Sequence, residues 1–111
     1  MATYIILFDF TPQGIENIKE SPNRVELVRQ AFQNMGARVK DFYMVLGQYD
    51  TIIIAEAPDD ETIAKLSLAI SSLGNVLVQT HRAFTEDEYR NIIRTLPQIP
   101  KKATRTLKKK R

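Results

Sequence analysis

Apolar residues recur with two different periods along this chain of 111 residues. Four runs rich in β-branched and aromatic residues have the length of strands, and they cover residues 3–10, 38–46, 51–57 and 76–84. In the segments before the second and fourth runs, apolar side chains recur every three or four residues, which predicts helices. The order β-α-β followed by β-α-β predicts an α+β fold with the ferredoxin-like βαββαβ topology.

Residues that favour helix ends mark the limits of both predicted helices. Ser21 is expected to cap the first helix, with Pro22 in its first turn and Gly36 after its last turn. The second helix is expected to begin after Pro58 and to end at Gly74. The apolar faces of the two helices are then Val25, Val28, Phe32 and Met35 in the first, and Ile63, Leu66, Ile70 and Leu73 in the second.

Two further segments, outside the two helices described above, also favour helical structure. Thr11-Pro12 favours a short helical turn after the first strand, which Gly14 weakens. After the last strand, Thr85 and Glu88 have the spacing of a capping box. We therefore predict a short C-terminal helix that lies on the domain itself or on a second subunit, with an apolar face of Tyr89, Ile92, Ile93 and Leu96. The domain is assigned to residues 1–96, and residues 97–111 to a flexible basic tail.

The strands carry apolar residues on both faces. In the first strand Ile6 and Phe8 lie on one face, whereas Ile5 and Leu7 lie on the other, and residues 52–55 repeat this arrangement. Two helices on one side of a sheet leave its other side uncovered. We therefore expect a homodimer or a larger homo-oligomer, and the alternative is a monomer whose own C-terminal helix covers that side.

Composition and charge divide the chain into a folded part and a tail. Hydrophobic residues make up 43% of the sequence, as in a folded domain. The net charge of +3 hides an asymmetry, because the first 100 residues hold nine of the 16 basic residues and all 13 acidic ones. The tail is therefore a candidate polyanion-binding segment that would attract nucleic acid or polyphosphate through Lys101, Lys102, Arg105, Lys108, Lys109, Lys110 and Arg111.

Several classes of protein are disfavoured by what the sequence lacks. There is no cysteine and only one histidine, which excludes disulfides, thiolate catalysis and a Cys/His zinc site, so we expect no metal and no cofactor. The N-terminal segment reads as a strand that meets Asp9, without the pattern of a signal peptide. No apolar run approaches the roughly 18 residues of a membrane span. We expect a cytoplasmic protein without membrane contact.

The turn LGQYDT at residues 46–51 carries more side-chain chemistry than a turn needs. Gly47 supplies the backbone conformation of the turn. Tyr49 packs its ring and directs its hydroxyl to a polar partner, and Asp50 is suited to accept backbone N–H bonds that close the hairpin. The alternative is that these groups bind a small polar ligand at a subunit junction.

Few side chains are suited to catalysis. His81 is an acid or base near neutral pH, and Asp9 interrupts an otherwise apolar strand. Tyr43 lies on the opposite side of its strand from Phe42 and Met44, where it is able to line a dimer cavity. The sequence has no Ser/His/Asp series and no phosphate loop, so these three residues are weak catalytic candidates.

The turn and the segments around it resemble the GYD domain family. The resemblance rests on Gly47-x-Tyr49-Asp50, APDD at residues 57–60, SLGNV at 72–76 and AFTED at 83–87, and it covers roughly residues 2–90. It implies a ferredoxin-like fold of the dimeric α/β-barrel type. It implies no established reaction.

A more distant similarity concerns the effector-binding domains of Lrp/AsnC-type regulators. Those domains also place a Gly-x-Tyr/Phe-Asp motif at the turn between strands two and three, where small effectors such as amino acids bind at subunit contacts. Because Thr80 also matches their pattern, the similarity implies a ligand-binding set of Gly47, Tyr49, Asp50 and Thr80. The chain has no helix-turn-helix region, so DNA recognition by that route is not implied.

Three hypotheses for function result. The leading one is a non-enzymatic, homo-oligomeric domain that binds a small polar ligand or serves in assembly. The first alternative is a cofactor-free enzyme of the dimeric α/β-barrel kind, such as a monooxygenase or an isomerase, which acts in the cavity between subunits. The second alternative is polyanion binding through the basic tail.

Overall fold

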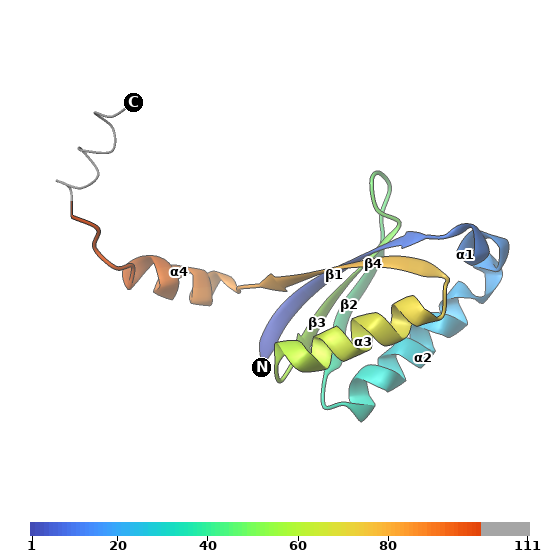
Figure 1. Cartoon of the computed structure of the whole chain (residues 1–111), viewed down its shortest axis with the longest axis horizontal. Coiled ribbons are helices and arrows are strands. Elements are labelled where there is room, and N and C mark those ends of the chain that lie inside the picture. Colours follow the sequence, from blue (N-terminus) through green and yellow to red (C-terminus); the bar gives the residue numbers. More distant parts are fainter. Residues whose placement is uncertain (101–111) are drawn as a thin grey trace.

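The computed structural model describes residues 1–100, which form a four-stranded antiparallel sheet with two helices on one side (Figure 1). The strand order in the sheet is β2-β3-β1-β4. The strands are β1 (Ala2–Phe10), β2 (Arg38–Met44), β3 (Thr51–Ala57) and β4 (Val76–Ala83). The predicted α+β fold is confirmed, and this order of elements is consistent with the ferredoxin-like topology.

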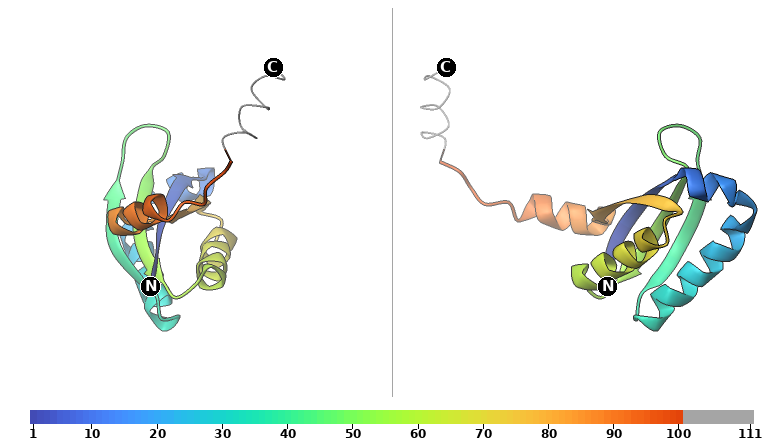
Figure 2. Two further views of the ribbon diagram at one scale, coloured as in Figure 1. Left: turned by 90° about the vertical axis from the view of Figure 1, so that its left-hand side faces the viewer. Right: turned by 45° about the vertical axis from the view of Figure 1, so that its right-hand side comes forward.

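Helices α2 (Ser21–Asn34) and α3 (Asp60–Ser72) lie on the same side of the sheet (Figure 2). Helix α3 is capped by Asp59, whose Oδ1 accepts a hydrogen bond from Thr62 N at 2.9 Å. The predicted cap of α2 is wrong. A turn of 3₁₀ helix, η1 (Ile18–Glu20), leads directly into α2, so Ser21 is already helical and the preceding Glu20 makes no side-chain cap.

The hydrophobic core lies between the helices and the sheet. It is formed by alternate residues of β1 and β3, by one face of α3 and by the fully buried Phe32 of α2. Met35 and Leu73 were expected to extend the apolar helix faces, but they are exposed because each is the C-cap residue that follows its helix. The buried core residues are Tyr4, Ile6, Phe8, Phe32, Ala37, Ile53, Ala55, Ala57, Ile63, Leu66 and Ile70.

The short helix α1 (Pro12–Glu16) packs closely against the turn between α3 and β4. Thr11 N donates to Asn75 O at 3.0 Å, and Thr11 Oγ1 donates to Gly74 O at 2.6 Å. A Cβ atom on the buried Gly14 would lie only 2.0 Å from Asn75 O. Glycine at this position therefore allows the contact between α1 and the turn.

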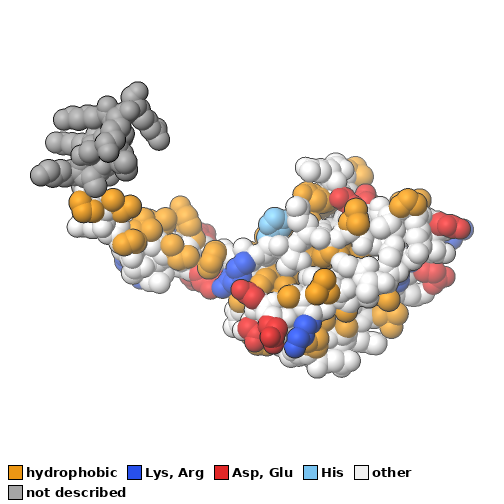
Figure 3. Space-filling model, in the orientation of Figure 1, with side chains coloured by type: hydrophobic (Ala, Val, Ile, Leu, Met, Phe, Trp, Pro, Cys, Tyr) orange, Lys and Arg blue, Asp and Glu red, His pale blue; other side chains and the backbone are white. Residues whose placement is uncertain are grey.

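Helix α4 (Glu86–Arg94) follows β4 and stands away from the rest of the domain (Figures 1 and 2). The predicted capping box is present, since Thr85 Oγ1 accepts from Glu88 N and Glu88 Oε1 accepts from Thr85 N. The apolar side chains that follow it stay exposed, and Figure 3 shows hydrophobic groups along this helix. Within residues 1–100, no helix is long and apolar enough to span a membrane.

Candidate functional site

The side of the sheet that faces away from α2 and α3 has an apolar centre. The register between β1 and β3 pairs Ile5 with Ile54 and Leu7 with Ile52, which brings four aliphatic side chains together on this side. All four are only half-buried. We call these four residues the open sheet face.

Polar residues flank the open sheet face on both edge strands. They are Asp41 and Tyr43 of β2 and Gln79 and His81 of β4, and we call these four residues the polar frame. A surface with an apolar centre and a polar border has the composition of a protein-protein interface. From β2 to β4, one row across the sheet is Asp41, Ile54, Ile5 and His81, and the next row is Tyr43, Ile52, Leu7 and Gln79.

The turn between β2 and β3 is bonded to the rest of the sheet through its two conspicuous side chains. Gly47 has a φ angle of +128°, a conformation that other residues rarely adopt. Asp50 Oδ2 accepts a hydrogen bond from Phe10 N at 2.8 Å, so the expected backbone donor is present but belongs to β1. The Tyr49 hydroxyl donates to Gln79 Oε1 of β4 at 2.5 Å. The turn is thus hydrogen-bonded to the central strand β1 and to the edge strand β4.

A polar groove of about 340 Å³ lies beside this turn, at one end of the open sheet face. It brings Asp9 of β1 together with Gln48 and Tyr49 of the turn and Gln79 of β4. The sequence placed Asp9 among the catalytic candidates and Tyr49 among the ligand-binding ones, and the fold puts them in one groove. Both residues are half-buried.

Thr80 lies apart from the other residues of the predicted ligand-binding set. It pairs with Ile6 in the register of β1 and β4, so it lies on the side of the sheet that carries the helices. Its Oγ1 is 2.8 Å from Ser67 Oγ of α3, within hydrogen-bonding distance. Thr80 therefore joins β4 to α3 and does not line the groove beside Tyr49.

The weak catalytic candidates are spread over the surface of one copy. Tyr43 lies on edge strand β2 and His81 on edge strand β4, which are three strand spacings or roughly 14 Å apart. Within the described part of the chain, no group of three or more His, Cys, Asp or Glu side chains is placed to hold a metal ion. The seven basic residues of the predicted polyanion-binding tail lie outside the described residues.

One charged cluster was not found from the sequence. The buried Tyr4 hydroxyl donates to Asp60 Oδ1 at 2.5 Å, and the Arg82 guanidinium lies 5.6 Å from the centre of the Tyr4 ring. The same guanidinium lies 4.5 Å from the centre of the Phe84 ring. Burial raises the pKa of Tyr4 to about 12, and the hydrogen bond and negative charge of Asp60 act in the same direction.

The raised pKa of Tyr4 predicts a loss of stability in alkali. The folded protein favours the neutral phenol of Tyr4. The stabilisation that this preference contributes to the free energy of unfolding is complete below the ordinary tyrosine pKa of 10.0 and is lost as pH rises toward about 12. Urea unfolding across this pH range should show a free energy of unfolding that falls more steeply for the wild type than for Tyr4→Phe. Tyr43→Phe, at an exposed position on β2, is the matched control. Equal slopes for the wild type and Tyr4→Phe would contradict this assignment.

The chain is thus a small α+β domain with a motif-bearing turn, consistent with the ferredoxin-like class, and sequence comparison gives the family. A model of the GYD domain matches residues 4–93, and the chain belongs to the GYD domain family. The resemblance found in the turn motif is therefore confirmed.

A named relative and a solved structure are similar to this chain. The relative is the "Glutamine synthetase and cystathionine beta-lyase binding protein" of Thermus thermophilus, which is 37% identical over 84 residues, covering 75% of this chain and 88% of the relative. The crystal structure is that of TTHA0845 from the same organism, with 25% identity and a TM-score of 0.50, covering 77% of this chain and 95% of the other.

Proposed function

We propose that this protein is a non-catalytic binding module that pairs with a second copy through the open sheet face and recruits other proteins. The observation that carries the proposal is the cluster of Ile5, Leu7, Ile52 and Ile54, half-buried and uncovered in one copy. Removing such apolar area from water stabilises an assembly by about 25 cal/mol per Å². The polar frame around it is typical of the border of an interface.

The open sheet face is suited to pair with the same face of a second copy. A two-fold axis through the open sheet face sets the same apolar patch against itself, so no second complementary surface is required. In such a pair the aliphatic centres are opposed, and the Asp41 and His81 side chains remain toward the edges of the sheets. This arrangement is the dimeric α/β-barrel type that the family resemblance implies.

Helix α4 supports the same assembly. Tyr89, Ile92 and Ile93 form one apolar face of α4, and Leu96 follows shortly after its end. These four side chains are between 41% and 59% exposed. The helix stands away from its own domain, as Figure 1 shows, so a surface on the second copy is proposed to cover it. One association then buries both the open sheet face and the apolar face of α4.

Recruitment of other proteins is proposed from the relative. The name of this relative describes a protein that binds glutamine synthetase and cystathionine β-lyase, and this chain aligns with 88% of its length. These two enzymes are the first partners to test with this protein. Surface plasmon resonance with each immobilised enzyme should show saturable binding, and the absence of binding to both would contradict recruitment of these partners.

The polar groove favours a second activity, the binding of a small polar ligand. It combines the Asp9 carboxylate with the side chains of Gln48, Tyr49 and Gln79. A few converging polar groups beside apolar walls fix the orientation of a ligand. The carboxylate favours a ligand that carries an ammonium group, as an amino acid does. Thr80 has no place in this proposal because it lies on the other side of the sheet.

Sedimentation equilibrium tests the assembly at micromolar concentration. The wild type should sediment as a dimer or larger species, and Ile93→Lys should weaken association roughly tenfold, because a charge would enter the buried face of α4. Leu68→Lys, at an exposed apolar position on α3, is the matched control and should associate as the wild type does. A wild type that stays monomeric would contradict the proposed pairing.

A further inference from the structure

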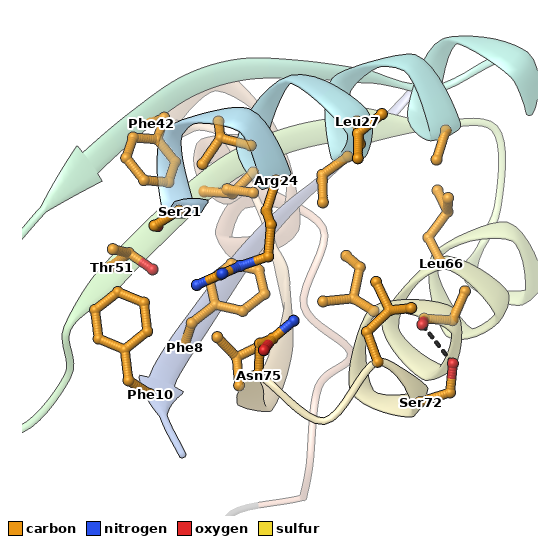
Figure 4. A pocket seen from close by; sticks show the side chains of 18 residues that line it. Phe8, Phe10, Ser21, Arg24, Leu27, Phe42, Thr51, Leu66, Ser72 and Asn75 are labelled. Carbon is orange, nitrogen blue, oxygen red and sulfur yellow. Dashed lines mark hydrogen bonds between the residues drawn. The ribbon is translucent and has the colours of Figure 1, made fainter. Parts of the chain in front are cut away.

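A cavity distinct from the polar groove lies on the helix side of the sheet, between α2 and α3 (Figure 4). Its volume is about 430 Å³, which is within the range of roughly 300 to 1,000 Å³ found for small-molecule sites. It is separate from the open sheet face, which is on the other side of the sheet. The apolar walls include Phe8, Phe10, Phe42, Val28, Leu66 and Ile70.

Arg24 brings a positive charge into this apolar cavity. The residue is half-buried, its Nη1 donates to Asn17 O at 2.9 Å, and its buried Nη2 has no hydrogen-bond partner within residues 1–100. No ion pair of Arg24 is formed among these residues. A buried donor without a partner costs free energy, and more so when the group is charged.

The position of Arg24 in α2 adds to this cost. Arg24 lies in the first turn of the helix, where the helix dipole disfavours a positive charge, and this turn holds no acidic residue. An anion paired with the guanidinium would also lie near the favourable end of the dipole. Within residues 1–100, the side chains that line the cavity include no carboxylate.

The wall opposite α2 is held in place by α1 and the turn after α3. Asn75 borders the cavity, and its Oδ1 accepts from Gln13 Nε2 at 3.0 Å while its main-chain oxygen accepts from Thr11 N. Figure 4 shows Arg24 extending between Phe8, Phe10 and Asn75. The guanidinium and the side-chain amide of Asn75 thus border the same end of the cavity.

We propose that this cavity binds an amphipathic carboxylate, with the carboxylate paired to the Arg24 guanidinium and the apolar body between α2 and α3. An arginine pairs well with a planar carboxylate, and the hydrogen bond is strengthened by both charges. A monoanion matches the single cation of the cavity, whereas a phosphate dianion would bring a second charge with no second cation among the lining residues. This site is independent of pairing through the open sheet face.

Calorimetric titration with decanoate, compared with 1-decanol, tests the site. Decanoate should bind the wild type, and Arg24→Met should weaken decanoate binding about tenfold or more, the effect of losing a charged hydrogen bond. Binding of 1-decanol should change by less than about twofold, because the apolar walls remain. Arg29→Met, which removes an arginine of α2 that pairs with Glu26, is the matched control and should bind decanoate as the wild type does.

A second variant separates binding from misfolding. Ala69 lines the cavity, so Ala69→Phe should fill it and weaken the binding of decanoate and 1-decanol alike, with an unchanged circular dichroism spectrum. Failure of the wild type to bind decanoate would overturn the proposal. Equal losses of decanoate and 1-decanol binding in Arg24→Met would also overturn it, because they would assign Arg24 a structural role only.

Discussion

Gly14→Ala is expected to lower the free energy of unfolding by about 3 kcal/mol or more, although alanine favours helix over glycine. The added Cβ would lie 2.0 Å from Asn75 O, which itself accepts the hydrogen bond from Thr11 N. Either α1 or the turn after α3 must move, and both border the packed core. The melting temperature should fall by roughly 12 to 24 °C in a domain of this size.

Glu16→Ala is the control for this substitution. Glu16 lies on the same short helix but is exposed, so its replacement should change stability by no more than about 0.5 kcal/mol. Both variants are compared with the wild type by thermal unfolding at one protein concentration, since association contributes to the measured stability. A Gly14→Ala protein as stable as the wild type would contradict the close contact between α1 and Asn75.

Ile54→Lys is expected to raise the dissociation constant of the assembly by at least about a hundredfold, or about 2.7 kcal/mol. Ile54 lies at the centre of the open sheet face, so pairing would remove the introduced ammonium group from water. In one copy the fold should tolerate the change, because Ile54 is half-buried and lies directly opposite Asp41 of β2.

Leu68→Lys makes the same chemical change on the other side of the molecule. Leu68 is 71% exposed on α3, away from the open sheet face, so this variant should keep the dissociation constant of the wild type. Dilution series by sedimentation velocity measure both variants, and circular dichroism checks their fold. Equal weakening by the two lysines would show that added charge, not the site of pairing, governs association.

Much of the fold could be predicted from the sequence because its signals are local. The apolar runs place all four strands, and Pro58, Gly74 and the Thr85 capping box place the helix ends within a few residues. The start of α2 was misplaced because Ser21 and Pro22 look like a helix start, whereas the turn of 3₁₀ helix before them carries the chain into α2 without a side-chain cap.

The contacts of the candidate sites could be predicted only in part, because they join distant residues. The turn motif identifies Tyr49 and Asp50, but their partners Gln79 and Phe10 depend on how the strands are paired. Sequence alternation alone also could not place Thr80 on the helix side of the sheet, away from the turn. In the sequence pattern Gly14 only weakens a short helix, and the packing of α1 against Asn75 shows why glycine is required there.

The cavity at Arg24 could not be predicted from the sequence pattern. An arginine among helical positions is usually solvent-exposed, and nothing local distinguishes Arg24 from Arg29 on the same helix. The difference arises because Arg24 lines the cavity between α2 and α3, where its Nη2 is buried, whereas the Arg29 guanidinium lies beside Glu26. Such a site depends on the spacing between elements that only the folded chain defines.

Isotope-filtered NOE spectroscopy on a mixture of labelled and unlabelled chains tests most directly whether the open sheet face pairs two copies. The experiment detects only contacts between different copies, so neighbours within one sheet do not contribute. We expect intermolecular NOEs between methyl groups of Ile54 in one copy and Ile5 or Leu7 in the other, and none from the exposed Leu68. An associated sample whose intermolecular NOEs arise from Leu68 and not from the open sheet face would contradict the proposed pairing.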